Sequence, residues 1–135
     1  MITFTQLGRY GRLGNQLFQY AAIKSASLET GHSLKIPNPD NVVWQNQKCY
    51  LSDFKLDCEF LSEQDYSRIQ YQFVEPDHTK FYPEVFKVPS NIDFIGYFQN
   101  YGYFSKHQDV IRKEFTLSDA IQKEASEYLS KIRVL

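Results

Sequence analysis

Apolar and polar residues alternate at the start of the chain, and helical spacing follows. Residues 2–7 alternate in the way that predicts a short strand. Residues 15–30 repeat apolar positions at helical spacing, with Asn15 as the expected N-cap and Gly31 as the expected C-terminal stop. Residues 33–36 alternate again. The order strand, loop, helix, strand predicts an α/β fold with a Rossmann-like parallel sheet and flanking helices.

The remainder of the chain is less regular. Residues 37–90 mix polar clusters with short aromatic pieces, and Ser62 marks the expected start of one short helix. The apolar pattern predicts three later elements: a buried strand at 91–96 and helices at 104–114 and 118–132. No repeat or linker separates these elements, so the 135 residues are expected to form one domain.

Composition excludes several classes of protein. The net charge is -1, with 42% hydrophobic and 23% charged residues, so the chain lacks the cationic excess that nonspecific nucleic-acid binding requires. No apolar run reaches the roughly 20 residues that span a bilayer, and the first residues lack the pattern of a signal peptide. We therefore expect a cytoplasmic protein that binds no nucleic acid; peripheral association with a membrane is compatible with this composition.

The sequence contains no recognisable metal or redox motif. Cys49 and Cys58 match neither a CxxC pair nor a zinc knuckle, and the three histidines stand singly, without a partner three or four residues away. We expect reduced thiols, no metal site and no cofactor.

A glycine-rich loop, GRLGNQLFQY at 11–20, joins the first predicted strand to the first helix. A helix start carries unpaired N–H groups and the positive end of the helix dipole, which favour an anion such as phosphate. The glycine spacing fits neither of the two common nucleotide-binding loops. The side chains able to bind phosphate or sugar are those of Arg9, Arg12, Asn15 and Gln16. Glycines that merely shape a turn explain the loop equally well.

A second candidate segment, GYFQNYGYF at 96–104, follows the strand predicted at 91–96. Ligands often bind at the ends of strands in α/β sheets. Aromatic faces suit a sugar ring and amides suit its hydroxyl groups. The predicted acceptor-side contacts are Tyr97, Phe98, Gln99 and Asn100. The alternative for each ring is a place in the core, which is the commoner role of such side chains.

These two segments resemble the α-1,2-fucosyltransferases of glycosyltransferase family eleven. RLGNQLFQYA at 12–21 is similar to the family's first block, with Arg12 in place of a glycine. GYFQ at 96–99 and IRKEF at 111–115 are similar to a second block, and GRLGNQ at 11–16 is similar to a turn of the protein O-fucosyltransferases. The resemblance is loose over residues 37–90.

The resemblance implies one half of a two-domain, GT-B-type glycosyltransferase. Residues 1–135 would be its N-terminal, acceptor-side domain. The C-terminal donor-binding domain is expected to be absent from this chain, because the family's His-x-Arg-Arg-x-Asp motif is not found in it. The chain by itself is therefore expected to be inactive.

The implied reaction is inverting transfer of fucose from GDP-fucose to the 2-hydroxyl of a galactoside, without a metal. The resemblance assigns five residues to the donor side of the cleft: Gly11, Arg12, Gly14, Asn15 and Gln16. No general base is identified among the acids of the middle region, which are Asp53, Asp57, Glu75, Asp77 and Glu84. The alternative function is a non-catalytic sugar-binding or interaction domain derived from such an enzyme.

Overall fold

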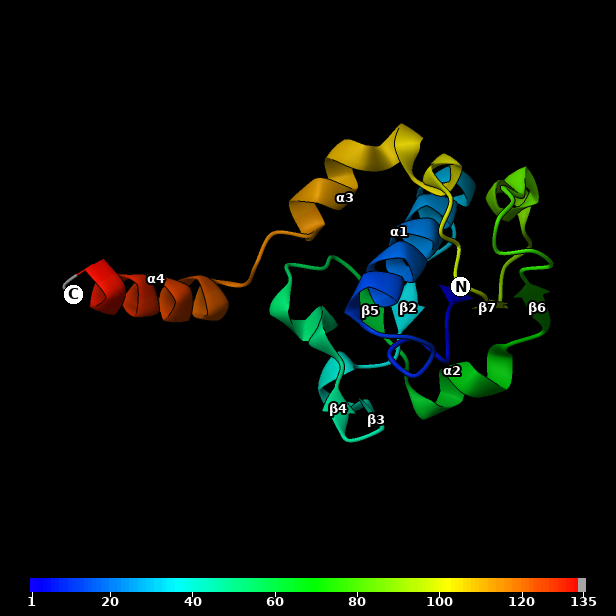
Figure 1. The fold of residues 1–135 in the computed structure, drawn as a ribbon. Helices are drawn as coiled ribbons and strands as arrows, with labels where there is room; N and C mark the ends of the chain where they lie inside the picture. Colours follow the sequence, from blue (N-terminus) through cyan, green and yellow to red (C-terminus); the bar gives the residue numbers. More distant parts are fainter. Residues whose placement is uncertain (134–135) are drawn as a thin grey trace.

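A small parallel sheet forms the centre of the molecule. The computed structural model describes residues 1–133, apart from the side chains of Gln47 and Arg133. Three strands lie in the order β1-β7-β6, all parallel (Figure 1): β1 (Ile2–Thr3), β7 (Ile92–Ile95) and β6 (Tyr71–Val74). The predicted strands at 2–7 and 91–96 are thus present, although the first is shorter because residues 5–9 form a turn.

A second parallel pair extends the sheet beside β1. Strand β2 (Lys35–Ile36) pairs with β5 (Glu59–Phe60), and a parallel bridge joins Ile2 to Leu34, directly before β2. The architecture is therefore mixed α/β with a small parallel sheet and flanking helices, which confirms the fold class at this level. Its identity as half of a GT-B enzyme stays a prediction.

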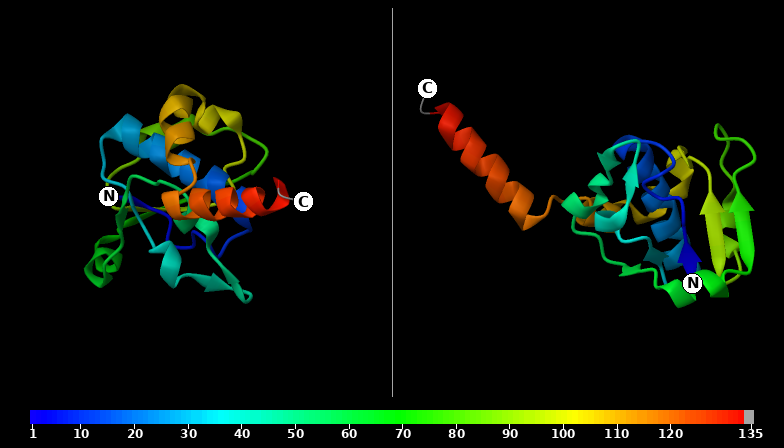
Figure 2. Two further views of the ribbon diagram at one scale, coloured as in Figure 1. Left: turned by 90° about the vertical axis from the view of Figure 1, so that its left-hand side faces the viewer. Right: turned by 90° about the horizontal axis from the view of Figure 1, so that it is seen from below.

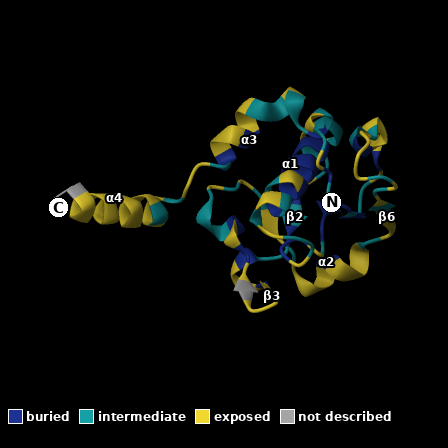
Figure 3. Ribbon diagram, viewed as in Figure 1, coloured by how far each residue is buried: buried dark blue, intermediate teal, exposed yellow. Residues whose placement is uncertain are grey.

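The helix α1 (Leu13–Thr30) packs against the sheet and holds much of the core. Figure 3 shows its dark, buried side facing the body of the protein. It ends as predicted at Gly31, which has φ 78° and donates its N–H to the carbonyl of Ser27. Its start differs from the prediction: Arg12 occupies the N-cap position, and Asn15 lies inside the first turn. Asn15 cannot cap the helix there, because its amide oxygen instead accepts a hydrogen bond from Gln99.

The middle region contains several short elements, of which only one was predicted. These are the hairpin of β3 (Val43–Trp44) with β4 (Gln47–Lys48), the helix α2 (Glu63–Arg68) and strand β6. The sequence did not predict strand β6. It is an edge strand with a largely exposed surface, so buried and exposed positions do not alternate along it.

Ser62 caps α2 as predicted. Its hydroxyl accepts from the N–H of Asp65 at 3.3 Å, and the Asp65 carboxylate accepts from the N–H of Ser62 at 2.8 Å. The hydrogen bonds from the N–H and hydroxyl of Ser62, together with the ammonium of Lys35, lower the pKa of Asp65 to about 2.

A buried ionic cluster fixes α3 (Gln108–Glu114) against α1. The Glu114 carboxylate lies 3.2 Å from the Lys24 ammonium and accepts hydrogen bonds from the Tyr20 hydroxyl and the N–H of Asp57. The two charged side chains are only 10% and 6% exposed. Burial raises the pKa of Tyr20 and brings that of the nearby Cys58 thiol to about 11. Both cysteines are free thiols, as predicted.

The helix α4 (Asp119–Arg133) projects away from the body of the protein (Figures 1 and 2). The chain before it is anchored, because Lys55 donates its N–H to the carbonyl of Thr116 at 2.9 Å and Ser118 donates to that of Asp53 at 2.7 Å. The apolar side chains that predict this helix lie exposed: Tyr128, Leu129 and Ile132 are 65%, 51% and 48% accessible. Within residues 1–133, no helix combines the length and apolarity that a membrane span requires.

Candidate functional site

Gln19 joins the two segments that the sequence singled out. Its side chain is fully buried, and its amide nitrogen donates to the carbonyls of Tyr10 at 2.8 Å and of Gly96 at 3.0 Å. The rings of Tyr10 and Tyr97 stack with their centroids 4.8 Å apart. The glycine loop and the aromatic segment, 77 residues apart at this bond, are therefore packed against each other.

A second hydrogen bond between the glycine loop and the aromatic segment lies at the exposed side of their contact. The amide nitrogen of Gln99 donates to Asn15 Oδ1 at 2.5 Å. Asn15 also lies against Gly11, which has φ +107°; a Cβ there would come within 2.6 Å of Asn15 Nδ2. Gly11 is therefore required by the backbone of the loop and by the position of Asn15.

The start of α1 is open to an anion. No side chain caps it and its first turn contains no acidic residue. Arg12, at the N-cap position, is exposed and forms no ion pair with another described residue. Free N–H groups at the positive end of an 18-residue helix, next to a guanidinium, are the features that favour a phosphate or carboxylate.

Gln16 and Gly14 have different surroundings from those of Arg12. Gln16 is buried, donates to the carbonyl of Gly11 at 3.2 Å and accepts from the Cys49 thiol at 3.5 Å, so it supports the loop from within. A Cβ at Gly14 would meet no atom within 4 Å. Sterics inside the chain therefore do not require a glycine at position 14.

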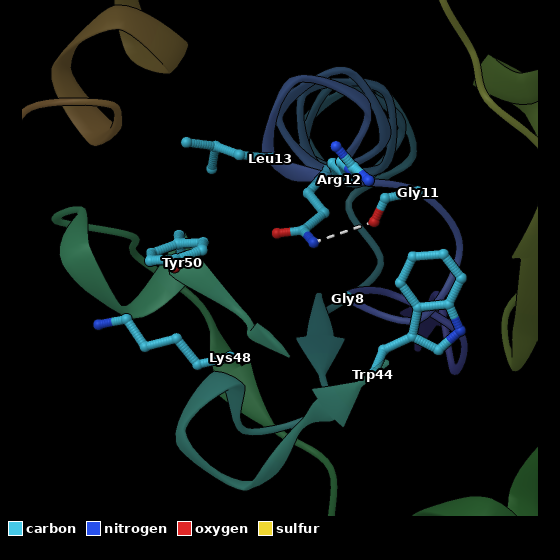
Figure 4. A pocket seen from close by; sticks show the side chains of 8 residues that line it. Gly8, Gly11, Arg12, Leu13, Trp44, Lys48 and Tyr50 are labelled. Carbon is cyan, nitrogen blue, oxygen red and sulfur yellow. Dashed lines mark hydrogen bonds between the residues drawn. The ribbon is translucent and has the colours of Figure 1, made fainter. Parts of the chain in front are cut away.

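A pocket of about 280 Å³ lies between the glycine loop, the start of α1 and the β3–β4 hairpin (Figure 4). It is lined by Gly8, Gly11, Arg12, Leu13, Gln16, Trp44, Lys48 and Tyr50. Figure 4 shows Trp44 and Tyr50 on opposite sides, with Arg12 and Gly11 at the helix start between them. Arg9 does not line the pocket. Burial also raises the pKa of the Cys49 thiol behind this wall.

Sequence reasoning missed the residues that the hairpin brings to this pocket. Trp44, Lys48 and Tyr50 lie in the region without a legible pattern, and the only available signal was that Trp44 is the single tryptophan of the chain. The Lys48 ammonium lies 5.1 Å from the centre of the Tyr50 ring and 3.5 Å from Asp53 Oδ1. The pocket lining therefore contains two aromatic and two cationic side chains, and Figure 4 shows the Lys48 ammonium extending outward past Tyr50.

The hairpin reaches the pocket through a strained turn. Gln45 and Asn46, the two residues between β3 and β4, have φ 50° and 61°. Two-residue hairpin loops of this kind prefer Asn-Gly, because glycine adopts positive φ without steric cost. The glutamine at the first position costs about 1 kcal/mol relative to a residue that tolerates this region.

The aromatic segment presents fewer contacts than the sequence predicts. The Phe98 ring is fully buried among the rings of Phe4, Phe94 and Tyr103, so it belongs to the core and does not contact a surface ligand. The amide oxygen of Asn100 accepts from the N–H of Gly102 at 2.8 Å and so stabilises its own turn. Tyr97 and Gln99 remain accessible at the surface.

Glu75 has a structural role in this turn. Its carboxylate accepts from the N–H of Tyr97 at 3.0 Å and from that of Phe98, which has φ 51°. A Cβ at Gly96 would come within 2.5 Å of the Glu75 Cβ, which explains the glycine there. Of the acids named as base candidates, none lines the pocket: they are Asp53, Asp57, Glu75, Asp77 and Glu84. In residues 1–133, no three His, Cys, Asp or Glu side chains form a group able to hold a metal.

An apolar groove of about 370 Å³ lies on the other side of the first turn, between α1 and α3. Gly14, Leu17 and Phe18 line it from α1, and Phe104, Ile111 and Phe115 line it from the opposite wall. Gly14 therefore faces this groove, whereas Gly11 and Arg12 face the pocket beside the hairpin.

Comparison of the chain with protein-family models, with curated proteins and with solved structures gives no match.

Proposed function

We propose that this chain provides the acceptor-side half of a glycosyltransferase site that transfers fucose from GDP-fucose to the 2-hydroxyl of a galactoside. The observation that carries the proposal is the meeting of the two motif segments. Gln19 bonds to the carbonyl of Gly96, and Asn15 bonds to Gln99, beside the open start of α1. The two segments that resemble the fucosyltransferases most clearly, 11–20 and 96–99, are thus in contact, although they are distant in sequence.

The open helix start is suited to the donor diphosphate. When the fucosyl group leaves GDP, negative charge increases on the diphosphate oxygens. The N–H groups of the first turn and the Arg12 guanidinium stabilise that charge more strongly than they stabilise the ground state. The amide oxygen of Asn15 accepts the hydrogen bond from Gln99. The amide nitrogen of Asn15 is therefore available to a hydroxyl or phosphate oxygen.

A direct test is titration of the isotopically labelled chain with GDP-fucose, GDP and guanosine, followed by NMR of the backbone amides. GDP and GDP-fucose are expected to shift the amide resonances of residues 13–15, and guanosine is expected to leave them unchanged. Arg12→Gln should weaken GDP binding about tenfold, because it removes a charge-assisted contact. Arg9→Gln is the matched control, since Arg9 is an exposed arginine of the same loop outside the pocket.

Equal GDP affinity in the Arg12 and Arg9 variants would show that the Arg12 guanidinium does not contribute to GDP binding. Equal shifts with GDP and guanosine would exclude diphosphate recognition at this helix.

A second candidate function is sugar binding without catalysis. It is favoured by the composition of the pocket, whose lining contains two aromatic side chains and no carboxylate able to act as general base. A purified protein that binds galactosides but neither GDP nor GDP-fucose would support this alternative.

A further inference from the structure

We infer that the pocket between the glycine loop and the β3–β4 hairpin is a subsite for a single pyranose ring that carries a negative charge. The inference rests on the proposed function, because it takes this pocket as part of the acceptor side. It adds the chemical class of the sugar: an acidic one, with its charge on a carboxylate or a phosphate.

The aromatic walls argue for a sugar ring. Trp44 and Tyr50 lie on opposite sides of the pocket (Figure 4), and the apolar face of a pyranose packs well against an indole or phenol ring. The volume of about 280 Å³ lies just below the roughly 300–1,000 Å³ typical of small-molecule pockets. It therefore suits one ring and not a complete nucleotide sugar.

The charged side chains argue for an acid. The charged residues that line the pocket are Arg12, which the proposed function assigns to the donor diphosphate, and Lys48, which is left for an acid on the sugar; both are cations, although the whole chain has a net charge of -1. Asp53 contacts Lys48 from outside the lining, at 3.5 Å, and the Lys48 side chain is 58% exposed. Such a long, solvated pair is weak, so a ligand anion is able to compete with it.

The lining is held in position from behind. Cys49, directly after β4, donates its thiol hydrogen to the Gln16 amide oxygen at 3.5 Å. A Cβ at Gly8 would lie within 2.9 Å of the Cys49 sulfur, so the loop and the hairpin are in close contact there. The walls of the subsite thus come from two segments whose distance apart is fixed by buried contacts.

The single tryptophan gives a direct assay. Trp44 fluorescence is followed while the full chain is titrated with methyl galacturonide, galactose 6-phosphate or neutral methyl galactoside, and saturation-transfer NMR detects contact with the same ring. The two acids are expected to bind about fivefold or more tightly than the neutral sugar, and added salt should reduce this difference. A preference between the two acids identifies carboxylate or phosphate as the charge.

Lys48→Met is expected to remove most of the preference for the acids over the neutral sugar. Lys80→Met is the matched control, because Lys80 is an exposed lysine outside the pocket. Both substitutions are at exposed side chains, so both variants should fold.

Three results would overturn the inference. Equal binding of neutral and acidic sugars would exclude selection by charge, and absence of both the fluorescence and the NMR signal with every sugar would exclude the subsite. A stronger Trp44 response to GDP than to any sugar would assign the pocket to the nucleotide. The sugar titrations contain no nucleotide, so their outcome is independent of the GDP experiment that tests the proposed function.

Discussion

The Gln19 amide should be the main connection between the two motif segments, and Gln19→Met tests this. Methionine has nearly the same length and fills the same buried space, but it donates no hydrogen bond. The substitution removes the bonds to the carbonyls of Tyr10 and Gly96 while it leaves the packing of α1 largely intact.

The expected loss of stability follows from the number of polar atoms left without a partner. Each carbonyl that loses its donor costs about 1–3 kcal/mol if it stays buried. The Gln19 Oε1 atom is itself buried without a partner, so its removal stabilises the folded protein by about the same amount as the loss of one donor destabilises it. The net destabilisation is therefore about 2 kcal/mol, which corresponds to a fall of about 6–10 °C in the Tm of a domain of this size.

Urea denaturation of the wild type and of Gln19→Met, followed by circular dichroism, measures this difference. Gln64→Met is the control, because Gln64 is an exposed glutamine within a helix. Gln19→Met should also bind GDP more weakly, since Tyr10 and Gly96 lose the hydrogen bonds that hold the two segments together. A stability within about 0.5 kcal/mol of the wild type would refute the reasoning, because that is the usual range for surface substitutions.

Three further predictions concern other parts of the chain. Gly14→Ala should leave the Tm unchanged or raise it, with a gain of up to about 1 kcal/mol from helix propensity, and should leave GDP binding unchanged, because position 14 faces the apolar groove and not the pocket beside Arg12; calorimetry and titration measure the two effects. Glu114→Ala should destabilise the protein by about 3–5 kcal/mol in chemical denaturation, because it leaves a buried ammonium unpaired; an effect below 1 kcal/mol would show that the cluster is solvated. The stability contributed by Asp65, whose pKa is lowered chiefly by hydrogen bonds from Ser62, should be complete above about pH 4 and be lost as the pH falls toward 2, so the acid unfolding curve of Asp65→Asn should be flatter in that window.

The exposed face of α4 leads to one prediction about association. Tyr128, Leu129 and Ile132 are largely accessible, so the chain should self-associate in light scattering at high concentration, and replacement of all three by serine should abolish this. Monomeric wild-type protein at the highest concentration tested would contradict it.

Local sequence determined the elements whose contacts lie within one turn or one strand. The helical spacing of 15–30, the stop at Gly31 and the cap at Ser62 depend on neighbours three or four residues away, and the structure confirms all three. The mixed α/β class followed from the order of these elements. Asn15 was misplaced because a partner distant in sequence, Gln99, engages its side chain.

Tertiary structure alone decided which side chains share a surface. Phe98 and Tyr97 are adjacent in an aromatic segment, yet one ring is in the core and the other stacks on Tyr10, because the positive φ of Phe98 and the Glu75 carboxylate set the direction of the turn. The pocket beside Arg12 likewise depends on Trp44, which a hairpin carries to the start of α1. Contacts between segments so far apart leave no periodic trace in the sequence, since periodicity records only the neighbours along one element.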